Sequence, residues 1–236
     1  MTLWACLNIY NEKDLLQGCI DSIRDVLKDV KICAIDGAYE LFNIQSKILA
    51  AMEYEKGQSV LAECFLRFSM PDSSDGTLEI LEKNKIDVII KANGKAWKNE
   101  YEKRSQYLSV GQDGDWMVVI DGDERLRGRF DPRDVNGSDD WCISLKRDDN
   151  IPPYPILRVH KYEKGMRYYG AHHALWRGDR LVKRGDIENN WVLPNCWLDH
   201  RWSERGNMDQ VRHMGKGAYY RQLLQDEDAF RKEHGI

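Results

Sequence analysis

Blocks of apolar and polar positions predict strands and helices in turn along the first part of the chain. Residues 2–9 form an apolar run typical of a buried strand, and apolar positions between residues 15 and 27 then recur at helical spacing. Residues 31–35 form a second short apolar strand, which ends at Asp36. A strand, a helix and a strand at this spacing predict a βαβ unit, and therefore a parallel sheet.

The alternation resumes after a long interruption. Residues 38–72 are less regular, although Ile44–Met52 has helical spacing, and we interpret this segment as an insertion over the sheet edge. N-capping residues at 72–77 then precede the next helix. The further expected elements are a helix at about 76–84, a strand at 87–91, a helix at 98–110 and a wholly apolar strand at 116–120. This order is typical of a doubly wound domain.

The regularity fades beyond Pro132. Residues 141–145 predict another strand, several short strands are expected as far as Leu198, and residues 207–234 predict a helical tail. The second half also differs in charge, because residues 1–140 hold 18 Lys and Arg against 26 Asp and Glu, whereas residues 141–236 hold 17 against 13. The net charge of −4 argues against a protein that coats nucleic acid electrostatically.

The cysteine spacing and the hydropathy of the chain indicate the cellular compartment. The six cysteines are widely scattered without a C-x-x-C pair, which favours reduced thiols over disulfides or a zinc site. The sequence shows neither a secretory signal nor an apolar run of the ~20 residues that a transmembrane helix needs. We therefore expect a cytoplasmic protein without a transmembrane segment.

Acidic residues follow three of the expected parallel strands. Glu12 follows the first, Asp36 the second, and Asp121 and Asp123 the fourth. In an open parallel sheet, ligands bind outside the carboxyl ends of the strands, and Gly122 allows a sharp turn and a close approach to a ligand. Carboxylates at such a turn suit Mn²⁺ or Mg²⁺, which share ligands with substrate phosphates. The alternative is an acidic turn that only caps the next element, since D-x-D strings are common by chance.

With these residues in place, the chain resembles the family 2 glycosyltransferases of GT-A fold. The resemblance covers residues 2–130, and residues 165–220 more loosely, and it implies an α/β protein. Its sheet would be Rossmann-like, doubly wound and mostly parallel, with a smaller acceptor-side β region and a C-terminal helical tail. The segments that carry the resemblance are Leu7–Glu12, Ile35–Gly37, Asp72–Ile80, Glu102–Arg104 and Trp116–Glu124.

The resemblance also implies roles for single residues. Asp36 would read the nucleobase, a uracil, while Lys103 or Arg104 would lie near the diphosphate or ribose. The metal, Mn²⁺ or Mg²⁺, would be held by Asp121, Asp123 and His200. The residues expected to bind the donor are Tyr10, Asn11, Glu12, Asp36, Gly37, Lys103, Arg104, Asp121, Gly122 and Arg201.

The chain departs from the family pattern at two places. Family members run almost directly from Asp-Gly to Ser-x-Asp-Gly-Thr, whereas 34 residues separate Gly37 from Asp72 here, which leaves the roles of Asp72 and Asp75 open. A segment resembling Gly-x-x-His ends at His173, but Ala174 stands where a Glu often follows. An inverting transfer needs a base that deprotonates the acceptor hydroxyl. We predict His173 or Asp186 for it, with His172 and Asp199 as rivals.

These features together predict a metal-dependent hexosyltransferase that moves a sugar from a nucleoside-diphosphate sugar to an acceptor hydroxyl, with inversion. Residues 1–130 would bind the donor, and residues 131–236 would bind the acceptor and form the C-terminal helices of one continuous domain. The expected acceptor is a glycan or lipid-linked glycan, and a modified DNA base is the second possibility. A nucleotidyltransferase would show a Gly-rich loop after the first strand, and an inactive sugar-nucleotide-binding module would not need to retain its aspartates.

Overall fold

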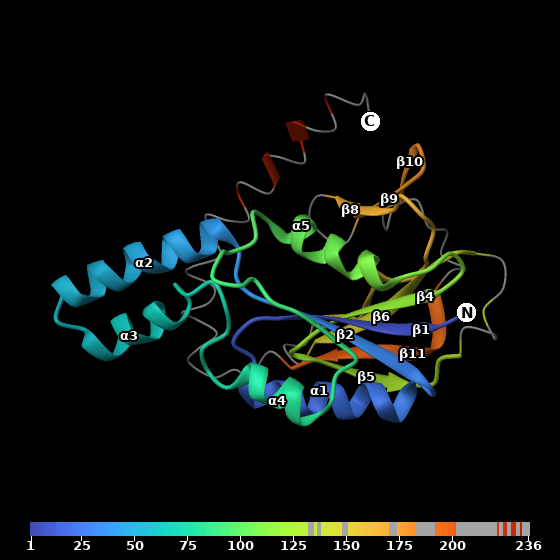
Figure 1. Ribbon diagram of the computed structural model, residues 1–236, viewed down its shortest axis with the longest axis horizontal. Coiled ribbons are helices and arrows are strands. Elements are labelled where there is room, and N and C mark those ends of the chain that lie inside the picture. The colour runs from blue at the N-terminus through green and yellow to red at the C-terminus, as the bar shows by residue number, and fades with distance from the viewer. Residues whose placement is uncertain are drawn as a thin grey trace.

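A computed structural model describes residues 1–131, 135, 138–147, 151–169, 174–182 and 192–201, together with 221, 224, 225, 228, 229 and 232. Within these residues the chain is a mixed α/β protein built on one large sheet (Figure 1). None of the helices in this part of the chain is long and apolar enough to span a bilayer. The expected tail at 207–234 and the acceptor-side residues His172, His173 and Asp186 lie outside the described residues, apart from six scattered positions of the tail.

The large sheet has eight strands in the order β3-β2-β1-β4-β7-β6-β11-β5. The first four strands in this order are parallel, β7 is antiparallel to both of its neighbours, and β6 runs parallel to β11. This is the Rossmann-like, mostly parallel arrangement expected of a GT-A fold. The strands are β1 (Leu3–Ile9), β2 (Val30–Asp36), β3 (Val88–Ile90), β4 (Trp116–Asp121), β5 (Glu124–Gly128), β6 (Asp140–Arg147), β7 (Tyr154–Lys161) and β11 (Val192–His200).

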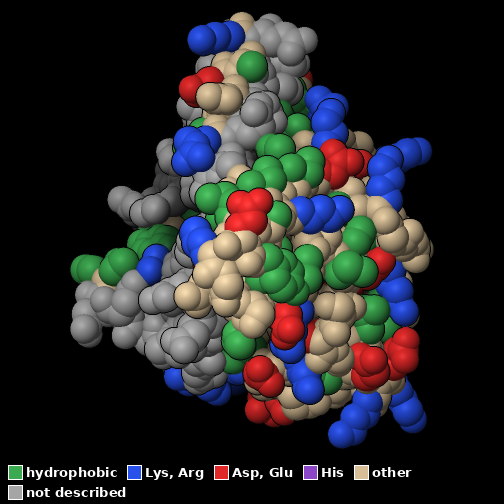
Figure 2. Space-filling view, turned by 90° about the vertical axis from the view of Figure 1, so that its left-hand side faces the viewer, with side chains coloured by type: hydrophobic (Ala, Val, Ile, Leu, Met, Phe, Trp, Pro, Cys, Tyr) green, Lys and Arg blue, Asp and Glu red, His purple; other side chains and the backbone are tan. Residues whose placement is uncertain are grey.

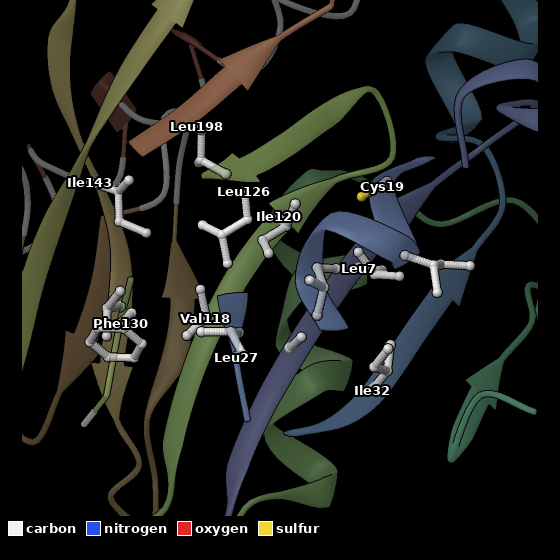
Figure 3. Packing of buried hydrophobic residues seen from close by; sticks show 14 of the residues in the cluster. Leu7, Cys19, Leu27, Ile32, Val118, Ile120, Leu126, Phe130, Ile143 and Leu198 are labelled. Atoms are coloured by element: carbon white, nitrogen blue, oxygen red, sulfur yellow. The ribbon is translucent and has the colours of Figure 1, made fainter. Parts of the chain in front are cut away.

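Two layers cover the sheet because its central strands are apolar on both faces. Along β1, Leu7 and Ile9 face one buried cluster, whereas Trp4 and Cys6 face the other. The first cluster, shown in Figure 3, packs against helices α1 (Lys13–Val26) and α4 (Thr77–Lys83). The second packs against α5 (Glu100–Ser105), the 3₁₀ turn η1 (Gln106–Val110) and a separate small sheet of β8 (Arg167–Tyr169), β9 (Ala174–Arg177) and β10 (Arg180–Val182).

The insertion between β2 and α4 is a helical hairpin rather than a cover over the sheet edge. Helices α2 (Glu40–Glu55) and α3 (Ser59–Arg67) pack on each other and project from the body (Figure 1). Their shared core contains Phe42, Phe65 and Phe68, and Tyr10 of the β1–α1 loop lies against two of these rings. The helical spacing at Ile44–Met52 therefore identified one helix of the pair.

The second half of the chain contributes longer strands to the main sheet than the sequence suggested. β6 and β7 have eight residues each and β11 has nine, and β11 also pairs with β5 from the first half. Strand β11 thus returns the chain to the acidic turn, because its His200 is the register partner of Glu124. The six cysteines are free thiols, as expected, and five of them are buried.

Candidate functional site

The parallel register brings the candidate residues to one rim of the sheet. Ile9 of β1 is level with Asp36 of β2, and Asn8 of β1 is level with Asp121 of β4. The Asn8 amide donates a hydrogen bond to the Asp121 carboxylate at 3.0 Å. Since parallel strands end on the same side, the acidic residues that follow them in the sequence share this rim.

The acidic turn lies tightly against the β1–α1 loop. A Cβ added at Gly122 would lie 2.9 Å from Cγ2 of Ile9 and 3.3 Å from the side chain of Glu12, and the Gly122 N–H donates to the Asn8 carbonyl at 3.1 Å. Glycine is required at this position because there is no space for a side chain. The close approach anticipated for Gly122 is therefore made to the protein itself.

Two arginines hold Asp121. Its Oδ1 accepts from Nη2 of Arg104 at 2.9 Å, and its Oδ2 accepts from Nη2 of Arg158 at 3.0 Å. The side chains of Arg104 and Arg158 are 4% and 2% exposed, and Arg104 also pairs with Glu100 at 2.8 Å. Buried charged hydrogen bonds of this kind are stronger than exposed ones, so the two arginines fix the position of the Asp121 side chain.

Arg158 also binds a carboxylate that sequence reasoning did not select. Its Nη2 donates to Oε1 of Glu124 at 2.7 Å, and Oε2 of Glu124 accepts from the N–H of Asp121 at 2.8 Å. Complete burial raises the pKa of Glu124 well above its ordinary value, although Arg158 acts in the opposite direction. Nothing in the pattern of residues 154–161 indicates that an arginine there reaches the acidic turn.

Asp123 lies beside the histidine that was expected to share its metal. His200 Nε2 is 3.1 Å from Oδ2 of Asp123, whose side chain is 2% exposed, and the Arg201 N–H donates to the Asp123 carbonyl at 3.0 Å. An imidazole and a carboxylate at this separation suit a divalent cation that takes its remaining ligands from water and phosphate. No group of three or more His, Cys, Asp or Glu side chains within the described ranges is arranged to hold a metal.

Asp36 is buried beneath the loop that follows the insertion. The Ser73 N–H donates to Oδ2 of Asp36 at 2.9 Å, and the Ser73 hydroxyl donates to Oδ1. The same hydroxyl accepts from the Asn11 N–H at 2.8 Å. Burial raises the pKa of Asp36 above its ordinary value, while Lys103 and the two bonds from Ser73 partly offset that effect. The 34-residue insertion therefore leaves this loop in contact with the β1 and β2 ends.

The same loop caps the start of α1 and the end of β3. Asp75 accepts from the Lys13 N–H at 3.1 Å, and Thr77 Oγ1 accepts from the Glu12 N–H at 2.8 Å. Asp72 accepts from the N–H groups of Asn93 and Gly94 at 2.9 and 2.7 Å. Asp72 and Asp75, whose roles the sequence left open, thus bind backbone donors of neighbouring loops.

The side chain of Lys103 bridges the ends of β1 and β2. Its ammonium donates to the carbonyls of Ile9 and Gly37 at 2.8 and 2.6 Å, and its residue is 1% exposed. Gly37 has φ +120°, and a Cβ there would meet Ala92 at 2.6 Å, so only glycine fits. Lys103 therefore lies next to the expected nucleotide site, with backbone carbonyls as hydrogen-bond partners.

Comparison with known proteins adds only a distant structural likeness. No protein-family model matches the chain, and no curated protein matches it. Among solved structures, residues 1–349 of S. aureus TarS give a TM-score of 0.41 at 14% identity, covering 64% of this chain and 38% of that one. The same protein in complex with UDP-GlcNAc gives a TM-score of 0.41 at 14% identity, and the match covers 64% of this chain and 36% of that one. The chain thus spans less than two fifths of these relatives, and likeness at this level does not place it in a family.

Proposed function

We propose that this chain is a glycosyltransferase that moves a sugar from a uridine-diphosphate sugar to an acceptor hydroxyl, with inversion and with Mn²⁺ or Mg²⁺ at the acidic turn. The observation that supports this most is the contact between Asp123 and His200 on the rim that also carries Asp36 and Asp121. A carboxylate and an imidazole from different strands, meeting at the carboxyl ends of a parallel sheet, suit a cation that a diphosphate can share.

Each residue of the site would have its own role in the transfer. Asp123 and His200 would hold the cation, which neutralises the diphosphate as its bond to the sugar breaks. Asp121 would keep its position through Arg104 and Arg158, and the buried rim would keep bulk water from the leaving group. Asp36 would accept a hydrogen bond from the imide N–H of a uracil once the Ser73 loop admits the base.

The acceptor is proposed to be a hydroxyl of a glycan or lipid-linked glycan. The overall charge of −4 supports this over a nucleic acid, because binding of a phosphate backbone needs a concentration of Lys and Arg. Release of UDP from UDP-sugars in the presence of glycans, lipid-linked glycans or duplex DNA would distinguish the acceptors. Turnover with DNA alone would contradict this part of the proposal.

Donor binding is tested by thermal unfolding with UDP, GDP, CDP and dTDP, each with and without Mn²⁺. UDP with Mn²⁺ should stabilise most, by about 2.7 kcal/mol at 100-fold its dissociation constant. Asp123→Ala should remove the effect of Mn²⁺. The matched control is Asp139→Ala, an aspartate that is 57% exposed and pairs with Lys161 elsewhere on the surface, and it should keep that effect. Failure of every nucleoside diphosphate to stabilise the wild-type protein with Mn²⁺ would refute the donor site.

The base is tested separately, because a base acts on the acceptor and not on the donor. His173→Ala should leave the affinity for UDP and Mn²⁺ unchanged and reduce the transfer rate by about 10²-fold or more. Asp186→Asn tests the rival assignment by the same two measurements. A His173→Ala protein that transfers sugar at the wild-type rate would show that His173 is not the base.

A further inference from the structure

The buried carboxylate of Asp36 is closed off by Ser73. Asp36 is 0% exposed, and both of its carboxylate oxygens accept hydrogen bonds from Ser73, Oδ2 from the N–H and Oδ1 from the hydroxyl. Ser73 itself is partly exposed. A carboxylate reads a base through a direct hydrogen bond of about 3 Å, so a base cannot reach Asp36 while this arrangement holds.

The loop that carries Ser73 is fixed on both sides of this residue. Before it, the Pro71 carbonyl accepts from the backbone just after β2 at 2.8 Å, and the Asp72 carboxylate accepts from two N–H groups that follow β3. After it, the Ser74 N–H donates to a side chain of the β1–α1 loop at 2.9 Å. Opening the whole loop would break these bonds together, so a smaller movement is the easier way to uncover Asp36.

The hydroxyl of Ser73 can leave Asp36 without a change in the backbone. Rotation about χ1 to another staggered position takes the hydroxyl off Oδ1. The bond from the Ser73 N–H to Oδ2, at 2.9 Å, belongs to the backbone and stays in place. The hydroxyl gives up its bond to Asp36 and the 2.8 Å bond that it accepts from the Asn11 N–H. Asp36 then offers one free oxygen, in a fixed position, to a donor on the base.

The chemistry of that free oxygen selects the base. An ionised carboxylate only accepts hydrogen bonds, so it needs a donor on the ligand. The imide N–H of uracil is such a donor and can replace the hydroxyl on Oδ1 of Asp36. The corresponding ring nitrogen of cytosine carries no proton and is itself an acceptor. Uracil therefore compensates for the loss of the hydroxyl bond, and cytosine does not.

The surface at this end of the molecule gives a nucleotide no general attraction. Figure 2 views the side from which the hairpin projects, and acidic and basic side chains are interspersed over the described part of this face. A surface of mixed sign does not concentrate an anionic ligand as a patch of one sign does. Affinity for the nucleotide therefore depends on individual contacts, among which the one to Asp36 has to be uncovered first.

We propose that the Ser73 hydroxyl is a gate for the nucleobase, which holds Oδ1 of Asp36 in the free protein and rotates away when uracil binds. The gate rests on the proposed function, because it presumes that Asp36 reads a uracil. It lowers the affinity for uridine nucleotides, since the binding-competent arrangement is only a fraction of the free protein. A base without an imide N–H gains nothing when it displaces the hydroxyl.

Calorimetric titration of UDP in the presence of Mn²⁺ tests the gate. Ser73→Ala should bind UDP about fivefold more tightly than the wild type, because the hydroxyl bond no longer has to be broken. The variant should unfold at a lower temperature, since the Asn11 N–H loses its acceptor, and binding is therefore measured well below that temperature. Ser74→Ala is the matched control, because Ser74 is exposed and its backbone bond to Asn11 is kept, and it should bind UDP as the wild type does.

CDP shows whether the gain depends on the imide N–H. Ser73→Ala should leave the affinity for CDP unchanged, so the preference for UDP over CDP should rise by about fivefold. An equal gain for both nucleotides would mean that the substitution only loosens the loop, and it overturns the gate. A wild-type protein that binds UDP, with a Ser73→Ala variant that binds it no more tightly, also overturns the gate but leaves the proposed function standing. Failure of the wild type and both variants to bind UDP refutes the donor site itself.

Discussion

Asp121 is held by side chains from three different elements. Asn8 comes from β1, Arg104 from α5 and Arg158 from β7, and each places a nitrogen within 3.0 Å of a carboxylate oxygen. Arg158 also donates to Glu124 from the same nitrogen that binds Asp121. Removal of Arg158 would therefore leave Asp121 and Glu124 close together without the cation that they share, which costs more than the loss of one contact.

This leads to a prediction for Arg158. Arg158→Met should lower the free energy of unfolding by about 3–5 kcal/mol and weaken the binding of UDP with Mn²⁺, and Arg158→Lys should retain part of both. The matched control is Arg127→Met, since Arg127 is 42% exposed and pairs with Asp199 at 3.2 Å, and it should cost less than about 1 kcal/mol. Denaturant unfolding measures the stability of the Arg158→Met and Arg127→Met proteins. An equal loss of stability in the two would contradict the role of Arg158.

At the scale of elements, a second buried charge cluster joins the large sheet to the small one. Asp140 of β6 lies 3.1 Å from Nδ1 of His160 on β7 and 3.0 Å from Nη2 of Arg177 on β9. Burial by itself raises the pKa of Asp140, but the hydrogen bond and charge of His160 and the Arg177 guanidinium outweigh it, so the pKa is lower than its ordinary value.

The sign of this shift determines how stability depends on pH. A carboxylate whose pKa is lower in the folded than in the unfolded state stabilises the fold when the pH is above its unfolded-state pKa of about 3.9. It loses that contribution as the pH falls through the folded-state pKa. Asp140→Asn should therefore cost about 1.5–3 kcal/mol at pH 7 and flatten the loss of stability below pH ~4.

Unfolding of wild type and variant by denaturant between pH 7 and pH 2.5 would measure this difference, with Asp139→Asn as the exposed neighbouring control. A difference between wild type and Asp140→Asn that stays the same at every pH would contradict the assignment.

The helices and strands themselves were largely predictable, and their partners were not. The nearly continuous burial along β1 and β4 follows the apolar runs in the sequence, and the expected helix at 15–27 corresponds to α1. The pairing of α2 with α3 depends on a separate cluster in which their phenylalanines pack with one another and with Tyr10. Local periodicity indicates that a face is apolar, but it does not indicate which element covers that face.

At the scale of the whole molecule, the sheet joins the two halves that the charge distribution separated. Strands β6, β7 and β11 from the second half extend the sheet of the first, and β11 pairs with β5 directly after the acidic turn. Arg158 and His200 consequently reach the acidic turn, which is expected to bind the donor, from the half expected to bind the acceptor. Any division of labour between donor and acceptor therefore runs across one continuous sheet.

The sequence by itself determined which segments form the parallel strands and which acidic residues stand at their ends, because both depend on neighbouring positions along the chain. Only the tertiary structure decided that Arg158 holds Asp121 and Glu124, that His200 meets Asp123, and that Ser73 covers Asp36 across the insertion. Those contacts join residues 34 to 77 positions apart, and they depend on strand order and register, which long-range packing sets.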